Sequence, residues 1–240
     1  MKQLILDQEL LELFPDTSIG VLVCRGLDNH VKEQDRFAPL LRECEKESVC
    51  YTGADEWLDN PVVASWREAF YKFKTKKGAR CSIEALLKRV KNGGEIGCIN
   101  PLVDIYNAAS LKFGLPIGGE NVDEFQGDMH LTIAKGGEAF ITYGSDKDEP
   151  ALEGEVIYAD DYGAICRCWN WRECVRTMLT EDVTNAVMVV ELSGLEPDGT
   201  IERLDKCLDW LADKIESELG GTVRKAVLNG ENKAVEISGH

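Results

Sequence analysis

Two groups of polar residues in this 240-residue sequence have the side chains needed for bond-breaking chemistry. Asp104 and Asn107 form the first group, and because they lie three positions apart in an expected helix they share one face. Their neighbours are apolar and must be buried, and a buried carboxylate or amide needs hydrogen-bond partners. The two side chains could tie down neighbouring backbone, or they could line a pocket and hold an ammonium group or a water molecule.

The second group is a run of two large rings and three polar side chains that directly follows an expected strand. Its members are Trp169, Asn170, Trp171, Arg172 and Glu173. The run could be core packing beside a surface ion pair. Tryptophan rings next to an amide are also typical of the wall of a small-ligand pocket. The residue types alone leave these two interpretations open.

Metal and nucleotide chemistry has less support. Cys166, Cys168 and Cys174 lie near one another, but no histidine or Cys-x-x-Cys pair completes a set of about four zinc ligands. The three histidines form no ligand pair and have no evident serine or cysteine partner. The sequence contains neither a phosphate-binding loop nor a dinucleotide-binding glycine motif. It therefore predicts no metal and no cofactor.

The elements that position these residues follow from the spacing of apolar side chains. A period of three to four residues, with caps and breakers at the ends, predicts helices over residues 8–13, 34–50, 62–73, 83–91, 102–113 and 200–219. Apolar runs predict buried strands over residues 19–24 and 186–190. Turn residues between apolar segments predict hairpins that pair 129–133 with 139–143 and 156–158 with 164–169, and a last hairpin at Asn229-Gly230.

Helices dominate the first half of the chain and strands the second. This order predicts an α+β fold with mixed or antiparallel β-sheets, hairpins in the second half, and flanking helices from the first half together with a C-terminal helix. No linker or repeat divides the chain, so we expect one domain over residues 1–240.

The chain is acidic, with 27 Lys and Arg against 43 Asp and Glu and a net charge of −16. Such a molecule repels anionic membranes and bulk nucleic acid such as DNA. Residues 67–91 are the exception, because they hold nine basic and two acidic residues. This segment could be the solvated face of two helices, or it could contact the phosphates of a nucleic acid. The candidate phosphate contacts are Lys72, Lys74, Lys76, Lys77 and Arg80.

The N-terminal residues and the cysteines indicate the cellular compartment of the protein. The first residues turn acidic at Asp7, and no run approaches the roughly 18 apolar residues of a membrane helix. The nine cysteines are odd in number and scattered without a framework spacing. We expect a reduced, cytoplasmic protein with no membrane partner.

Several motifs in series resemble the B3/4 domain, the tRNA-binding and editing module of the phenylalanyl-tRNA synthetase β subunit. The matching pieces are Val103-Asp104-Ile105-Tyr106-Asn107 with Leu111, Gly114 and Pro116, then Phe125-Gln126-Gly127-Asp128, Val156-Ile157-Tyr158-Ala159-Asp160 and Thr180-Glu181-Asp182-Val183-Thr184-Asn185. A looser match places residues 19–26 on the first strand of the module. The resemblance implies a freestanding relative of this module, with basic helices over about residues 61–91 and a terminal helix and hairpin over about 194–237 as additions.

In that family the module hydrolyses tyrosine that has been attached wrongly to the phenylalanine tRNA. The resemblance therefore implies an oriented water, a side-chain pocket and a group that reads the tyrosine hydroxyl. Glu173 aligns, within one residue, with the glutamate that reads this hydroxyl. Gly118 stands where the family has its editing histidine, and residues 168–172 replace a glycine-rich pocket strand. The implied substrate contacts are Asn100, Gly118, Gly119, Trp169, Asn170, Trp171 and Arg172, with Glu173, Asp104 and Asn107 as catalytic residues.

Three hypotheses follow from these observations. The first is an aminoacyl-tRNA editing factor that acts in trans on the aminoacylated 3′ end of a tRNA. The second is a non-catalytic module that binds tRNA or a synthetase, and the glycine at position 118 favours it. The third is a hydrolase or sensor for a small amino-acid derivative. We also expect a smaller or more polar aminoacyl group than tyrosine, because Trp169 and Trp171 add bulk to the wall.

Overall fold

The computed structural model describes residues 1–238, which form six α-helices and ten β-strands. The helices are α1 (Gln8–Leu13), α2 (Ala38–Glu47), α3 (Pro61–Tyr71), α4 (Ser82–Lys91), α5 (Pro101–Phe113) and α6 (Thr200–Leu219). The strands are β1 (Gln3–Leu6), β2 (Ser18–Arg25), β3 (Ile117–Asn121), β4 (Met129–Ile133), β5 (Val156–Ala159), β6 (Ala164–Arg167), β7 (Arg172–Glu173), β8 (Asn185–Leu192), β9 (Thr222–Leu228) and β10 (Ala234–Glu236).

The strands form two sheets. One has six strands in the order β10-β1-β4-β5-β6-β7, and the other has four in the order β3-β8-β2-β9. β1 and β4 run parallel, whereas every other neighbouring pair is antiparallel. The predicted α+β class, with mixed and antiparallel sheets, is confirmed.

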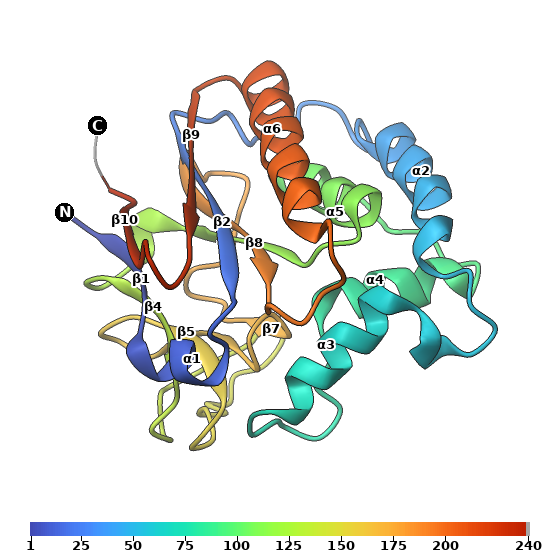
Figure 1. Cartoon of the computed structure of the whole chain (residues 1–240). Coiled ribbons are helices and arrows are strands. Elements are labelled where there is room, and N and C mark those ends of the chain that lie inside the picture. The colour runs from blue at the N-terminus through green and yellow to red at the C-terminus, as the bar shows by residue number, and fades with distance from the viewer. Residues whose placement is uncertain (239–240) are drawn as a thin grey trace.

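In the four-stranded sheet (Figure 1), β2 and β8 are buried on both faces, which explains their continuous apolar runs, whereas the edge strand β9 is largely exposed. Leu22 and Met188 point to the face that packs against α5 and α6, while Val21 and Val189 point to the opposite face. Gly20 lets α6 approach closely, because a Cβ at this position would lie 2.9 Å from Leu204 Cδ1. The central sheet thus has helices on one side and the six-stranded sheet on the other.

Most helix boundaries follow their predicted caps. The Asn100 side chain accepts a hydrogen bond from the Val103 N–H at 3.1 Å, and Gly114 ends α5 in the left-handed conformation that favours glycine. α4 begins at Ser82, one residue before the predicted start at 83, and its N-cap is Cys81. α2 begins at Ala38 instead of about 34, because Asp35 adopts a positive φ of 57°.

Two of the three hairpin predictions were wrong. β4 pairs with β1 and β5, and the segment 139–143 lies instead beside β6 and β7, where Ala164 N–H donates to Ala139 O and Val175 N–H to Ile141 O. The turn after Asn229 joins β9 and β10, which belong to different sheets. In both cases tertiary pairing overrides a local turn signal. The third hairpin is confirmed, since β5 pairs with β6 in the antiparallel sense, although β6 ends at Arg167, two residues earlier than predicted.

All nine cysteines are free thiols. None of the helices within residues 1–238 combines the length and apolar content that a membrane-spanning segment needs.

Candidate functional site

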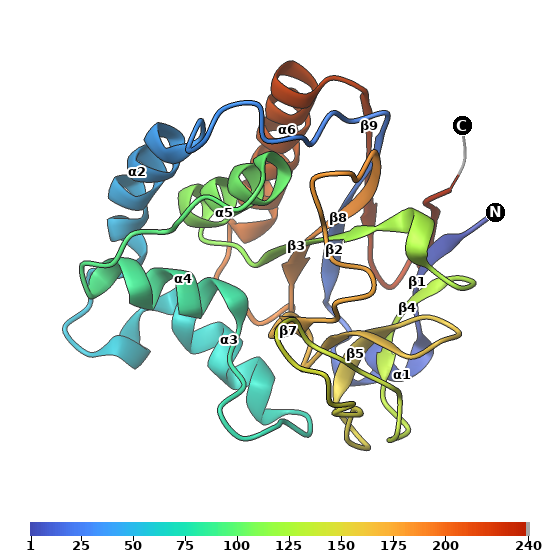
Figure 2. The ribbon, with the colours of Figure 1, turned by 180° about the vertical axis from the view of Figure 1, so that it is seen from behind.

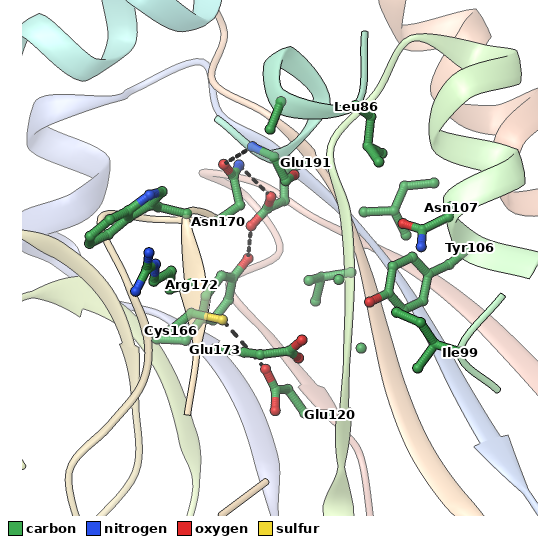
Figure 3. Close-up of a pocket in the computed structure, with 18 of the residues that line it drawn as sticks. Leu86, Ile99, Tyr106, Asn107, Glu120, Cys166, Asn170, Arg172, Glu173 and Glu191 are labelled. Carbon is green, nitrogen blue, oxygen red and sulfur yellow. Dashed lines mark hydrogen bonds between the residues drawn. The ribbon is translucent and has the colours of Figure 1, made fainter. Parts of the chain in front are cut away.

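A cavity of about 690 Å³ lies between the two sheets and is bordered by α4 and α5 (Figure 3). β3 and β8 supply one wall, and β5, β6 and β7 supply the wall across from it. The polar side chains that line it are Ser82, Arg89, Tyr106, Asn107, Glu120, Thr142, Tyr143, Tyr158, Cys166, Asn170, Arg172, Glu173 and Glu191. The apolar ones include Leu86, Ile117, Met129 and Val189.

Strand alternation places two carboxylates on the cavity side of the four-stranded sheet. Glu120 pairs with Val187 across β3 and β8, so it shares the face of Val187 and Val189 that looks toward the other sheet. Glu191, two residues after Val189, lies on the same face. Gly118 also shares this face, and a Cβ at Gly118 would meet only Val189 Cγ2 at 3.9 Å. The glycine leaves open space on this wall.

A strained turn separates Trp169 from the cavity. Cys168 and Trp169 have positive φ values of 47° and 61°, a conformation that costs about 1–3 kcal/mol for each such residue. The turn sends the Trp169 ring into the core, where it packs edge-on against Phe14 and Trp66 with centroids 4.7 and 5.2 Å away. It leaves Asn170 lining the cavity.

Glu191 is fully buried in the cavity wall. Its carboxylate accepts a hydrogen bond from the Tyr158 hydroxyl at 2.8 Å and another from Asn170 Nδ2 at 2.6 Å. Burial raises the pKa of Glu191 to about 7, although these two donors act in the opposite direction. The carboxyl group is therefore close to half-ionised at neutral pH.

Glu120 and Glu173 form an acidic pair near the edge of the sheets (Figure 3). Glu120 accepts hydrogen bonds from the Thr177 hydroxyl at 2.6 Å and the Cys166 thiol at 3.4 Å. Burial, and then the charge of Glu173, hold the pKa of Glu120 well above its usual range. Both effects favour the protonated form of Glu120.

The Glu173 side chain makes no hydrogen bond or ion pair with any residue within 1–238, although its backbone belongs to the ladder between β6 and β7. Protein groups replace much of the water around its carboxylate and raise the pKa of Glu173 to about 7. Its side chain still remains open to the cavity. Across the cavity lie the Tyr106 hydroxyl and the Asn107 amide, which likewise have no hydrogen-bond partner in the described part of the chain (Figure 3). Polar groups in this arrangement are available to a ligand.

Seven of the predicted site residues line this cavity. They are Asn107, Gly118, Gly119, Asn170, Trp171, Arg172 and Glu173. Two exposed arginines among the lining residues, Arg89 and Arg172, give the cavity its cationic groups, and Arg172 lies over the Trp171 ring at 4.8 Å.

The other three predicted residues lie elsewhere. Asn100 caps α5 and donates to Leu179 O at 3.1 Å. Asp104 accepts from the Ile99 N–H at 2.7 Å and does not line the cavity, because the first turn of α5 packs against the preceding loop. Trp169 is a core residue, so only Trp171 adds bulk to the wall.

The predicted basic contacts lie on the loop between α3 and α4, which continues into Ser82 at the cavity (Figure 2). Lys72, Lys74, Lys77 and Arg80 are exposed and have no ion-pair partner among residues 1–238. Lys76 is half-buried and forms an ion pair with Glu149. Four of the five cations are therefore free to meet an external anion.

Sequence reasoning missed four residues of the site: Tyr106, Glu120, Tyr158 and Glu191. Glu191 carried a usable signal, since a carboxylate inside the apolar run of β8 must be buried and needs partners. Glu120 had none, because β3 itself was not predicted. Among residues 1–238, no group of three or more His, Cys, Asp or Glu is arranged to hold a metal ion.

Comparison with known proteins gives one family. Residues 65–199 match the model of the B3/4 domain family, which confirms the resemblance drawn from the motifs. A solved structure, the N-terminal fragment of the phenylalanyl-tRNA synthetase β-subunit from Pyrococcus horikoshii, matches with a TM-score of 0.47 and 11% sequence identity. The match covers 92% of this chain and 50% of that one, so this chain spans about half its length. No protein with a curated description matches significantly.

Proposed function

This chain belongs to the B3/4 domain family, and we propose that it binds the aminoacylated 3′ end of a tRNA and hydrolyses the aminoacyl ester. The observation that supports this most is the unpartnered Glu173 carboxylate, which faces a cavity large enough for an aminoacyl group and has a pKa of about 7. A general base works best when its pKa lies near the working pH.

In the proposed reaction Glu173 removes a proton from a water molecule, whose oxygen attacks the ester carbonyl carbon. The C–O bond to the ribose then breaks, and the ribose oxygen takes up the proton from Glu173. Tyr106 and Asn107 lie across the cavity and have free donors, so they are the candidates to stabilise the oxyanion. This role differs from that of Asp104, whose carboxylate is committed to the backbone.

The basic loop supplies the tRNA contact in this proposal. Lys72, Lys74, Lys77 and Arg80 provide sequence-independent phosphate binding on a molecule whose net charge of −16 is otherwise unfavourable. Arg89 and Arg172, which are exposed and line the cavity, would contact phosphate next to the bound aminoacyl group.

A panel of mischarged aminoacyl-tRNAs tests the proposal. The wild-type protein should release at least one amino acid, and Glu173→Gln should slow this release roughly 100-fold or more, since positioned general bases typically contribute that much. Glu181→Gln, at an exposed position outside the cavity, is the matched control and should leave the rate unchanged. Full activity in Glu173→Gln would contradict the assigned role.

A second function, tRNA or synthetase binding without hydrolysis, has one observation in its favour. Gly118 contributes no polar group at the position where the motif resemblance implies a histidine, and the space beside it is open. Retention of tRNA by the wild-type protein with no release of any amino acid from the panel would identify this function.

A further inference from the structure

We propose that the aminoacyl group held in this cavity has a side chain that ends in a cation, as in lysine or ornithine, and that Tyr158 and Glu191 recognise this end. The proposal rests on the proposed binding of an aminoacyl group and adds the class of its side chain.

The cavity wall has two acidic positions that are separated along the six-stranded sheet. Glu173 pairs with Cys166, and Cys166 pairs with Tyr158, so these three residues lie side by side on β7, β6 and β5. Strands are spaced about 4.8 Å apart, which puts the Cα atoms of Glu173 and Tyr158 about 10 Å from each other. Glu120 lies next to Glu173 (Figure 3), whereas Glu191 lies at the Tyr158 position, where it accepts a hydrogen bond from the hydroxyl.

The Tyr158 position is built to accept a hydrogen bond from a ligand. The Tyr158 hydroxyl donates its proton to Glu191, so the lone pairs of its oxygen remain as acceptors on the cavity wall. Glu191 lies directly behind and supplies negative charge without itself reaching solvent. A hydroxyl polarised in this way attracts an ammonium group more strongly than an uncharged pair would.

The acidic side chains of the cavity also favour a ligand that carries two cationic groups. Three carboxyl groups line the cavity, and its two cationic residues, Arg89 and Arg172, are exposed to solvent. The α-ammonium of an aminoacyl ester would offset one acidic position, next to Glu120 and the reacting ester. A neutral side chain would leave Glu191 to hold its proton, whereas a cation at the second position would stabilise the ionised carboxylate.

The cavity also offers apolar surface to methylene groups. Ile117, Met129 and Val189 are among its lining residues. A side chain of three or four methylene groups would bury these carbons and carry its ammonium group toward Tyr158. An acidic side chain would meet like charge, and an aliphatic one would leave Tyr158 without a donor.

Binding of two amino alcohols tests the proposal independently of hydrolysis. Lysinol and norleucinol share the α-amine and the carbon chain, and only lysinol has the terminal amine. Isothermal titration calorimetry of the wild-type protein should show that lysinol binds at least tenfold more tightly. Glu191→Gln and Tyr158→Phe should each reduce this preference to less than threefold, whereas Glu181→Gln should preserve it.

The outcomes separate this inference from the proposed reaction. Equal affinity for the two alcohols, no detectable binding of either, or an unchanged preference in Glu191→Gln would overturn the inference. A clear lysinol preference in a protein that releases no amino acid from any tRNA would refute the hydrolysis and leave the inference standing. Glu191→Gln is the informative variant, because an amide at 191 can still accept from Asn170 and donate to the Tyr158 oxygen.

Discussion

Glu191 makes the stability of this protein depend on pH in a direction opposite to that of most carboxylates. Its pKa is about 7 in the folded protein against an ordinary value of 4.5. The folded state therefore holds a proton that the unfolded chain releases, and the free energy of unfolding falls as the pH rises between these values. Each pKa unit corresponds to about 1.36 kcal/mol, so ionisation of Glu191 costs the folded state about 3 kcal/mol in total.

Replacement of Glu191 by Gln removes this cost and keeps both hydrogen bonds. Part of the cost is already present at pH 5.5, where the unfolded chain is ionised and the folded protein is not. We expect the stability of Glu191→Gln relative to wild type to increase by about 2 kcal/mol between pH 5.5 and pH 8. Both values lie above the pI of about 4.7, where the protein has its lowest solubility.

Urea unfolding of the two proteins at both pH values measures this difference. The slope of the unfolding free energy against urea should be the same for both proteins, since the exposed surface does not change. Glu120 and Glu173 also titrate, but they are present in both proteins and their contributions cancel to first order. A stability difference that is constant or shrinks as the pH rises would refute the reasoning.

Three further predictions concern the cavity and the basic loop. The deacylation rate should rise with pH through about 7 and level off above pH 8, because Glu173 acts as a base only after it loses its proton. A rate that falls over this range would exclude Glu173 as the base. Gly118→Ala should change the free energy of unfolding by less than about 0.5 kcal/mol, because the space beside Gly118 is open. Gly119→Ala should destabilise the protein by about 1 kcal/mol or more, because its Cβ would lie 2.5 Å from Met188 Sδ. Thermal unfolding of the two variants measures this difference. Replacement of Lys74 and Lys77 by glutamate should weaken the binding of every tRNA tested. The slope of the logarithm of the binding constant against the logarithm of the salt concentration should become shallower by about 0.7 to 0.9 for each lost contact. An unchanged slope would show that the loop does not touch phosphate.

Local sequence signals were sufficient to predict the helices, because a helix is defined by its own caps and by the spacing of its own apolar residues. α6 begins and ends where its apolar period does, and α5 lies between the Asn100 cap and Gly114. The partners of strands were harder to predict, since a turn signal says only that the chain reverses. The turn after Asn229 does reverse the chain, but the edge of another sheet is available to β10.

The candidate site was predictable where residues were close in sequence. Residues 170–173 all line the cavity, as expected for a run that forms one wall. Trp169 was misplaced because two successive left-handed residues interrupt the strand, and a tryptophan gives no warning of that conformation. Glu120 and Glu191 share a cavity with Glu173 only through the packing of one sheet on another, which no spacing in a single sequence encodes.

The pairing of β1 with β10 brings the two ends of the described chain together at one edge of the six-stranded sheet, with Gln3 opposite Glu236 (Figure 1). β7, which contributes Glu173, forms the other edge. A short linker between the ends would therefore create a circular permutant whose new termini could be opened in the exposed loop at Asp146 and Lys147. Every strand would keep its neighbours in such a permutant. The cavity therefore depends on how the strands pack and not on the order in which they follow one another along the chain.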